Sequence, residues 1–272
     1  MRRDGLAQAL DDNGLRYGGT GLPSAITLWS RNRDLTADRH QTAWAMTQNN
    51  LGNALKNQGI RTAGAAGAAF LGEAVTAYSA ALEVHTRAEH SVPWATMQNN
   101  LGNALAAQGT RTIGTEGAAL LGEAVTAFRA ALEVRARAEH PLDWATTQNN
   151  LGNTLGDQGI RTGGKEGAAL LGEAVIAYRA ALEVRTRAEH PVDWAMTQNN
   201  IGATLKDKGT RTGGAEGATL LGEAVEAYRT ALEVRTRAEH PVQWAMTQGN
   251  IASLYRSWSA LAPNNAAAHL AT

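Results

Sequence analysis

The 272-residue chain carries 25 Lys and Arg residues and 25 Asp and Glu residues, so its formal charge is zero, which argues against nucleic acid as the main partner. The absence of cysteine excludes disulfides, thiolate nucleophiles and cysteine-ligated zinc. No apolar run reaches the length of a membrane span and no secretory signal follows the basic first residues, so we expect a cytoplasmic protein without a membrane partner.

Residues 1–43 resemble a degenerate first copy of a repeat, whose later copies are marked by a Trp every 50 residues. Residues 9–16 echo residues 54–61, and residues 25–40 echo the second half of a later copy, with Trp29 near its aromatic position. Fixed periods of this size are typical of solenoids, propellers and arrays. Atypical terminal copies cover the exposed ends of a solenoid, so we expect residues 1–43 to be a cap.

Residues 44–243 contain four complete copies, each predicted to hold two helices, A and B. In helix A, Trp144, Gln148, Leu151 and Leu155 fall on one face, at i, i+4, i+7 and i+11. Helix A should span about 15 residues, between an acidic N-cap and a C′ glycine. The predicted N-caps are Asp143 and Asp193, and the predicted C′ glycines are Gly59, Gly109, Gly159 and Gly209.

A Gly-rich loop is predicted to lead into a longer helix B. The pairs Glu133–Arg137 and Arg135–Glu139 should support its exposed end by a few tenths of a kcal/mol each. Residues 159–165 match the start of a phosphate-binding P-loop, but Glu166 stands where that loop needs Ser or Thr, so we exclude this motif. One His per copy is expected at a helix end, too far from the next to share a metal ion. These residues are His90, His140, His190 and His240.

Residues 244–262 are predicted to form a last helix A that caps the solenoid, with Tyr255 and Trp258 as its additional aromatic residues. Residues 263–272 are expected to be a flexible tail. The repeated Trp residues of the four copies are expected in the core, where each seals one copy against the next. They are Trp44, Trp94, Trp144, Trp194 and Trp244.

Several recurring residues resemble the tetratricopeptide repeat (TPR) family. Leu51, Gly52 and Leu55 resemble its helix A signature, and Ala124, Phe128 and Ala131 resemble its helix B signature. The family unit has 34 residues, and we place ten of the 16 extra residues in the A–B loop with the first turn of helix B, and six in the exit from helix B.

The recurring Ala-Leu-Glu-Val-Arg…His-Pro segment is most similar to the longer units of kinesin light chains, which bind extended peptide segments. The resemblance implies an all-α fold, a right-handed superhelical solenoid of antiparallel helix pairs. It also implies a groove that binds a peptide.

Asparagines recur on helix A, away from the Trp face, where the resemblance implies the concave surface. A carboxamide offers two donors and an acceptor, which suits the N–H and C=O groups of an extended peptide. The alternative is that one Asn of each set bonds to the neighbouring copy and fixes packing. Ala203 and Gly249 interrupt the stripe. The predicted peptide-binding residues are Asn49, Asn50, Asn53, Asn99, Asn100, Asn103, Asn149, Asn150, Asn153, Asn199 and Asn200.

An arginine recurs in the A–B loop, and the row could bind an anionic partner. We favour the alternative, an ion pair within the loop with Glu116, Glu166 or Glu216. Ala66 replaces this Glu in the first copy, so Arg61 is the residue expected to be free. The row consists of Arg61, Arg111, Arg161 and Arg211.

The sequence thus predicts a scaffold that binds a protein or peptide partner, without a cofactor or metal. No Ser–His–acid set and no pair of carboxylates stands apart from the repeat pattern, so we do not expect an enzyme. The alternative function is structural self-association, in which nearly identical copies stack end to end or swap.

Overall fold

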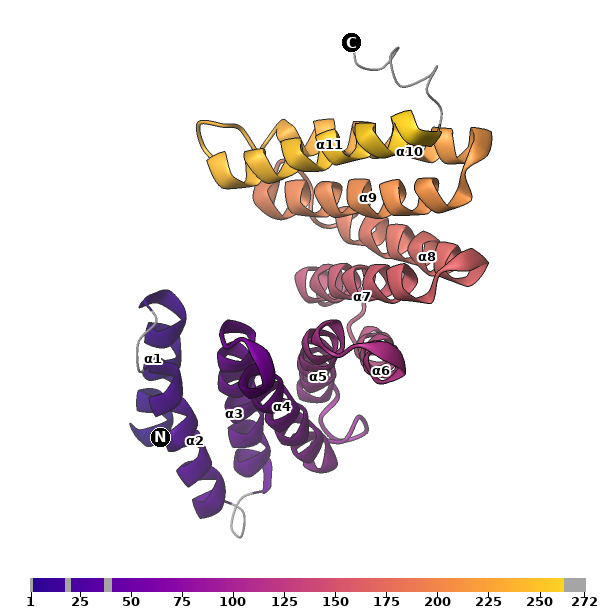
Figure 1. Ribbon diagram of the computed structural model, residues 1–272. Helices are drawn as coiled ribbons and strands as arrows, with labels where there is room; N and C mark the ends of the chain where they lie inside the picture. Colours follow the sequence, from indigo (N-terminus) through magenta and orange to yellow (C-terminus); the bar gives the residue numbers. More distant parts are fainter. Residues whose placement is uncertain (1, 18–20, 37–40, 262–272) are drawn as a thin grey trace. The chain divides into compact units, whose positions relative to one another are not determined.

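The computed structural model describes residues 2–17, 21–36 and 41–261, which form eleven helices and no strand (Figure 1). Helices α3, α5, α7 and α9 are the A helices of the four copies, and α4, α6, α8 and α10 are the B helices. The helices are α1 (Arg2–Tyr17), α2 (Gly21–Thr36), α3 (Gln41–Arg61), α4 (Gly64–Val84), α5 (Ser91–Arg111), α6 (Gly114–Leu132), α7 (Pro141–Thr162), α8 (Gly164–Leu182), α9 (Pro191–Thr212), α10 (Gly214–Leu232) and α11 (Pro241–Leu261).

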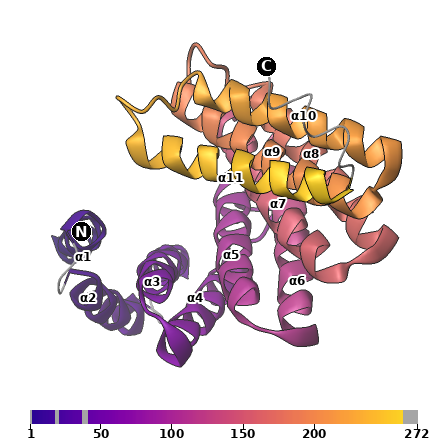
Figure 2. The same cartoon turned by 45° about the horizontal axis from the view of Figure 1, so that its top comes forward.

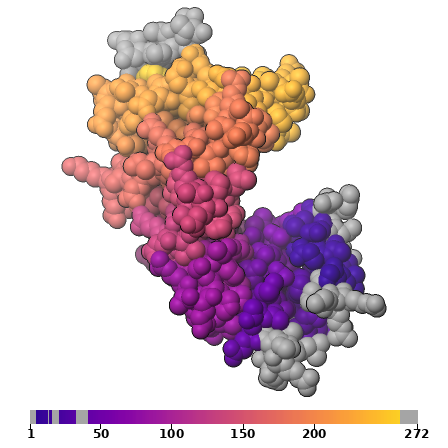
Figure 3. All heavy atoms as spheres, turned by 180° about the vertical axis from the view of Figure 1, so that it is seen from behind, coloured from indigo at the N-terminus to yellow at the C-terminus, as the bar shows by residue number. Residues whose placement is uncertain are grey.

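The chain divides into two compact units, Met1–Arg135 and Ala136–Thr272. Within each unit, an A helix packs most extensively on the B helix of its own copy, and that B helix packs on the following A helix. Successive A helices touch over a smaller area. The first unit therefore runs in the order α1 to α6 and the second in the order α7 to α11 (Figure 2). Within each unit, segments close in sequence are also neighbours on the surface (Figure 3).

The A helices begin earlier than the sequence pattern predicted. Helices α7 and α9 start at Pro141 and Pro191, and the residues before them, His140 and His190, occupy the N-cap positions. Proline suits the first helical position because its missing N–H would lack a helical partner there. Asp143, predicted as an N-cap, lies in the first turn instead, where its negative charge interacts favourably with the positive end of the helix dipole. The prediction that the repeated His residues stand at helix ends is confirmed.

The predicted C′ glycines lie inside the A helices, so that prediction is wrong. A Cβ at Gly59 would lie 2.8 Å from Leu71 Cγ and 3.0 Å from the Gly67 carbonyl oxygen, so glycine here permits close packing of helix A on helix B. Helices α7 and α9 end later, at Thr162 and Thr212, and are followed by the C-cap residues Gly163 and Gly213, whose φ angles are 72° and 66°. The residues that we placed in a loop therefore lengthen both helices instead.

The core of each copy forms where helix A meets helix B. A Cβ at Gly102 would lie 2.8 Å from the Phe128 ring, and Phe128 itself is fully buried with Leu121. Gly52, Gly152 and Gly202 make the same close approach to Tyr78, Tyr178 and Tyr228. The Leu-Gly pair of helix A thus provides the flat site on which the aromatic ring of helix B packs.

The repeated Trp residues are only partly buried, and Trp44 packs against a core cluster of Ala45, Ala81 and Met97, so the predicted core role holds only in part. The Arg87 guanidinium lies over the Trp94 ring at 5.8 Å from its centroid, and Arg137 lies over Trp144 at 5.7 Å. Such cation–π contacts contribute about 0.5–1 kcal/mol at exposed sites. The fully buried tryptophans are instead Trp29 and Trp258, in the terminal parts of the chain.

The charged residues at the exit of helix B connect successive copies. Helix α6 ends at Leu132, so the predicted i, i+4 pairs of Glu133 and Arg135 do not form within a helix. Arg87 pairs with Glu133 instead, and Arg137 pairs with Glu183. The side chains in these pairs are about half exposed, so each pair stabilises the stack only modestly.

Among the described residues, one helix, α4, is long and apolar enough to cross a membrane, judged by length and composition alone. We expected no such segment. Within the first unit, α4 packs on both α3 and α5, and a core helix of a repeat protein has the same composition. This helix alone therefore provides little evidence for a membrane partner.

Candidate functional site

The first Asn of each set joins successive copies. Asn49 accepts a hydrogen bond from Asn100 Nδ2 through its Oδ1 atom, at 3.0 Å. Asn149 is 4% exposed and accepts from the Thr197 hydroxyl at 3.2 Å. Asn99 is also buried. At this position the carboxamide therefore contributes to packing, as the alternative interpretation expected, and leaves a ligand little surface.

At the second Asn position, Asn50 Oδ1 accepts from Asn49 Nδ2 at 3.5 Å, whereas Asn100 and Asn200 keep one side of the carboxamide available. Asn100 and Asn200 each donate through Nδ2, to Asn49 at 3.0 Å and to Asn153 at 3.1 Å. These bonds use one amide hydrogen and leave the Oδ1 acceptor of both residues without a partner among the described residues. Both residues are half-buried. The free acceptors could receive the N–H groups of an extended peptide.

In the first and third copies, the third Asn of the set accepts a hydrogen bond from the Tyr of helix B. The Tyr78 hydroxyl donates to Asn53 Oδ1 at 2.8 Å, and the Tyr178 hydroxyl donates to Asn153 Oδ1 at 2.7 Å. Burial is the main cause that raises the pKa of both phenols, so they remain protonated donors. In the second copy Phe128 stands at the Tyr position and has no hydroxyl to donate.

Asn103 therefore differs from its equivalents. Among the residues that the structure describes, it has no hydrogen-bond partner for either end of its carboxamide. It is half-buried and lies in α5, one helical turn after Asn100 and Asn99. The sequence shows that Phe128 replaces the Tyr found at this position in the other complete copies. Only the Tyr–Asn hydrogen bonds in the structure reveal that this exchange leaves Asn103 without a donor.

The repeated loop arginines cap the preceding A helix. Arg111 donates to the carbonyl oxygens of Gly59 at 2.6 Å, Ile60 at 2.7 Å and Thr62 at 3.1 Å. These carbonyls lie at the C-terminal end of α3, where helical partners are missing and the helix dipole favours a positive charge. Arg111 is therefore a clamp between two copies.

The other arginines of the row correct the sequence-based expectations. Arg211 donates to the carbonyl oxygens of Gly159 and Ile160, each at 2.5 Å. Arg61, which we expected to be free, donates to Gly14 O at 2.6 Å and also to Leu15 O. Arg161 lies at the exposed end of α7. Arg111 and Arg211 thus bond to backbone carbonyls of the preceding copy, and within the described ranges neither pairs with Glu116 or Glu216, so the favoured Arg–Glu pairing is wrong for these two residues.

A small pocket opens beside the Asn stripe in the first unit, between α3 and α5 near the end of α4. Its volume is about 260 Å³, and carbon atoms form most of its surface. We call it the junction pocket. It is lined by Met46, Asn49, Asn50, His85, Val92, Pro93, Thr96 and Met97.

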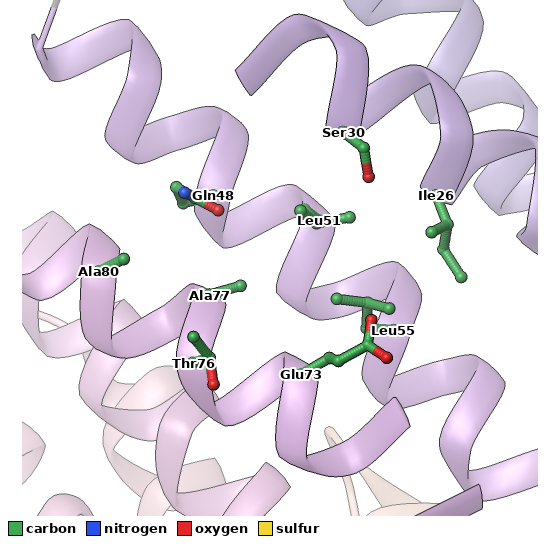
Figure 4. A pocket seen from close by; sticks show the side chains of 9 residues that line it. All are labelled: Ile26, Ser30, Gln48, Leu51, Leu55, Glu73, Thr76, Ala77 and Ala80. Carbon is green, nitrogen blue, oxygen red and sulfur yellow. The ribbon is translucent and has the colours of Figure 1, made fainter. Parts of the chain in front are cut away.

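A second type of hollow lies on the side of the B helices. In the first unit, side chains of α2, α3 and α4 surround a cavity of about 200 Å³, with Leu51 and Leu55 beside Glu73 and Ser30 (Figure 4). In the second unit, residues of α8, α9 and α10 at equivalent positions line a hollow of about 420 Å³, with Ile201 and Leu205 in place of Leu51 and Leu55. No group of three acidic or His residues that could hold a metal ion occurs in the described part of the chain.

Solved structures resemble this chain in fold. A crystal structure of nearly identical TPR-like repeats, from a Podosopora anserina protein assigned as a kinesin light chain, is 18% identical and aligns with a TM-score of 0.56, covering 83% of this chain and 93% of that one. A variant of the same repeats, with one Gln replaced by Met, is 16% identical and aligns with a TM-score of 0.57, covering 85% and 95%. No family model and no curated protein gave a match to the sequence. The predicted all-α, TPR-like helical solenoid is confirmed as the fold, and its function is a separate question.

Proposed function

We propose that this TPR-like repeat chain is a non-catalytic scaffold that binds an extended peptide segment along its A helices. The carboxamide of Asn103 is the observation that carries the proposal, because it is half-buried beside the stripe and has no partner among the described residues. The carboxamide has two donors and an acceptor, so the C=O and N–H groups of a peptide backbone would pair with both of its ends. The free acceptor of Asn100 extends the same surface in the first unit.

The test uses peptides selected on the wild-type chain from a displayed library of random 12-residue sequences. Their affinity is measured by isothermal titration calorimetry on wild type and on Phe128→Tyr. The new hydroxyl should bond to Asn103, as Tyr78 bonds to Asn53, and remove about 1 kcal/mol of binding, roughly a fivefold loss. Asn103→Ala should show a similar or larger loss.

The matched control is Tyr78→Phe, which frees Asn53 without introducing a competitor, and which should not weaken binding. These variants leave the hydrogen bonds between copies in place, which Asn100→Ala would not. Binding by Asn103→Ala and Phe128→Tyr within twofold of wild type would remove the stripe as the peptide site.

Self-association is the second candidate function, and one observation favours it. Arg237 lies over the Trp244 ring at 5.6 Å, as its equivalents lie over theirs, but it has no carboxylate partner among the described residues. Arg187, one copy earlier, pairs with Glu233 of the next copy. Sedimentation velocity over a hundredfold concentration range tests this: assembly through this end requires oligomers that Arg237→Glu abolishes, and a constant monomer excludes it.

A further inference from the structure

The junction pocket occurs where the first and second complete copies meet. Met46, Val92 and Met97 provide apolar walls from α3 and α5, and Asn49 and Asn50 stand at the same pocket. His85, at the C-terminal end of α4, is 2% exposed. The exposed faces of Met46 and Val92, 56% and 45% accessible, show that the pocket is open to the outside.

The equivalent positions in the second unit form a polar junction. Arg185 stands where His85 stands in the first unit; it is 7% exposed and donates to the Thr146 hydroxyl at 2.9 Å. Asp193, at the position of Pro93, lies close enough for its charge to raise the pKa of Arg185 against the larger lowering by burial. Thr197, at the position of Met97, donates to Asn149 at 3.2 Å. A long charged side chain and its partners thus occupy this junction.

Five of the eight lining residues differ between the two junctions: Met46 replaces Thr146, Thr96 replaces Met196, and three further exchanges make the first junction less polar. His85 is shorter than Arg185, Pro93 has no carboxylate, and Met97 has no hydroxyl. Burial, and then the neighbouring His90, lower the pKa of His85 below that of a free imidazole, against a backbone contact with Thr42 that raises it. The imidazole is therefore neutral at neutral pH. A charged group entering this pocket would lose its hydration without gaining a counter-charge.

We propose that the junction pocket binds one uncharged, apolar side chain of the peptide. The proposal rests on the proposed function, because Asn50 beside the pocket, whose Oδ1 accepts from Asn49 Nδ2 at 3.5 Å, would donate its own Nδ2 to the peptide backbone while the side chain enters. The volume of about 260 Å³ suits a single large apolar side chain. The chain would then read a peptide through two features, a backbone recognised along the stripe and one apolar residue recognised at the first junction.

The first experiment tests the pocket alone, by titrating isotope-labelled protein with N-acetyl-leucinamide and N-acetyl-tryptophanamide. We expect saturable shifts of the Asn49 and Asn50 side-chain amides and the Met97 methyl in NMR spectra, and none with N-acetyl-lysinamide. The triple variant His85→Arg, Pro93→Asp, Met97→Thr introduces the charged and hydroxyl side chains of the polar junction at three of the five differing positions and should lose these shifts. A wild-type protein that shows no shifts would overturn the proposal.

A matched gain of binding is expected in the second unit. The reverse variant Arg185→His, Asp193→Pro, Thr197→Met should create a second apolar pocket, with new shifts of the Asn149 amide. Circular dichroism before titration confirms that both triple variants remain helical. Failure of a folded reverse variant to bind either apolar probe would contradict the assignment of the pocket to these three positions.

The selected 12-residue peptides then separate this inference from the proposed function. The first triple variant should weaken them about tenfold, and replacement of one apolar peptide residue by Ala should cause the same loss in wild type but not in the variant. Peptides that depend on Asn103 but bind the triple variant normally would overturn the pocket and leave the proposed function standing. A dimer of wild type that the triple variant abolishes would make a second copy the occupant and also overturn it. Failure to select any peptide would overturn both.

Discussion

At the residue scale, the repeated polar side chains of this chain hold successive copies together before they can serve a partner. Arg111 reaches back 52 residues to Gly59, and Asn100 reaches back 51 residues to Asn49. Both side chains bond to groups of the preceding copy that local structure leaves unsatisfied. The identity of a repeated residue therefore does not reveal whether it binds a ligand, because the stacking of copies requires the same hydrogen-bonding groups.

The arginine clamp leads to a prediction for stability. Arg111→Ala removes three hydrogen bonds to carbonyls at the end of α3 and should lower the free energy of unfolding by about 2 kcal/mol. Chemical denaturation followed by circular dichroism measures this change. Lys165→Ala, at an exposed position in the first turn of α8, is the control and should change stability by less than about 0.5 kcal/mol. Equal effects of the two substitutions would show that the clamp does not stabilise the stack.

Buried His85 leads to a prediction for pH dependence. Because its pKa in the folded protein is lowered from 6.5, the unfolded chain binds a proton more readily, and stability must fall as the pH drops through about 6.5. His85→Gln removes this contribution. The unfolding free energy of wild type should therefore decrease more between pH 7.5 and about 5 than that of the variant, as denaturation at each pH would show. Parallel curves would contradict the lowered pKa.

At the element scale, the longer repeat arises from longer helices. Helices α7 and α9 have 22 residues each, and their B helices have 19, so little of the 50-residue period is left for loops. Glycines that look like helix ends in the sequence are places where two helices approach closely. A Gly in a helix interior costs about 1 kcal/mol relative to Ala, so its recurrence indicates a steric requirement in the packing.

Two glycines of the same unit should respond to Ala in opposite directions. Gly102→Ala places a methyl group 2.8 Å from the buried Phe128 ring and should lower the unfolding free energy by about 2–3 kcal/mol. Gly72→Ala meets only Gln108 at 3.7 Å inside α4 and should raise it by about 0.5–1 kcal/mol through helix propensity. Thermal and chemical denaturation compare the two variants. A destabilised Gly72→Ala would show that the B helix has another constraint at this position.

At the scale of the whole molecule, each copy depends mainly on its neighbours. Helix B of one copy packs on helix A of the next in both compact units, and the arginine clamps follow the same order. In a stack of this kind, stability is approximately a sum of contributions from copies and from the interfaces between them. Loss of one internal copy should then weaken the fold without destroying it.

Deletion of residues 141–190 tests this additivity. The deletion joins His140 to Pro191 and restores the sequence found at the other boundaries between copies. We expect a helical protein whose denaturant m-value is lower by roughly a fifth, in proportion to the surface no longer buried, with a lower melting temperature. An unfolded product would show that the copies depend on contacts beyond their neighbours.

The sequence by itself determined the all-α repeat class, the register of the copies and the types of residue available on each helix. The pattern of Leu51, Gly52 and Tyr78 follows from helical periodicity and from the size of an aromatic ring, which are local properties. Only the tertiary structure decided which atoms remain free. Arg61 donates to the Gly14 carbonyl oxygen, and Asn103 has no partner among the described residues. Hydrogen bonds between copies connect atoms about 50 residues apart, so the stacking geometry that selects them lies outside any local pattern.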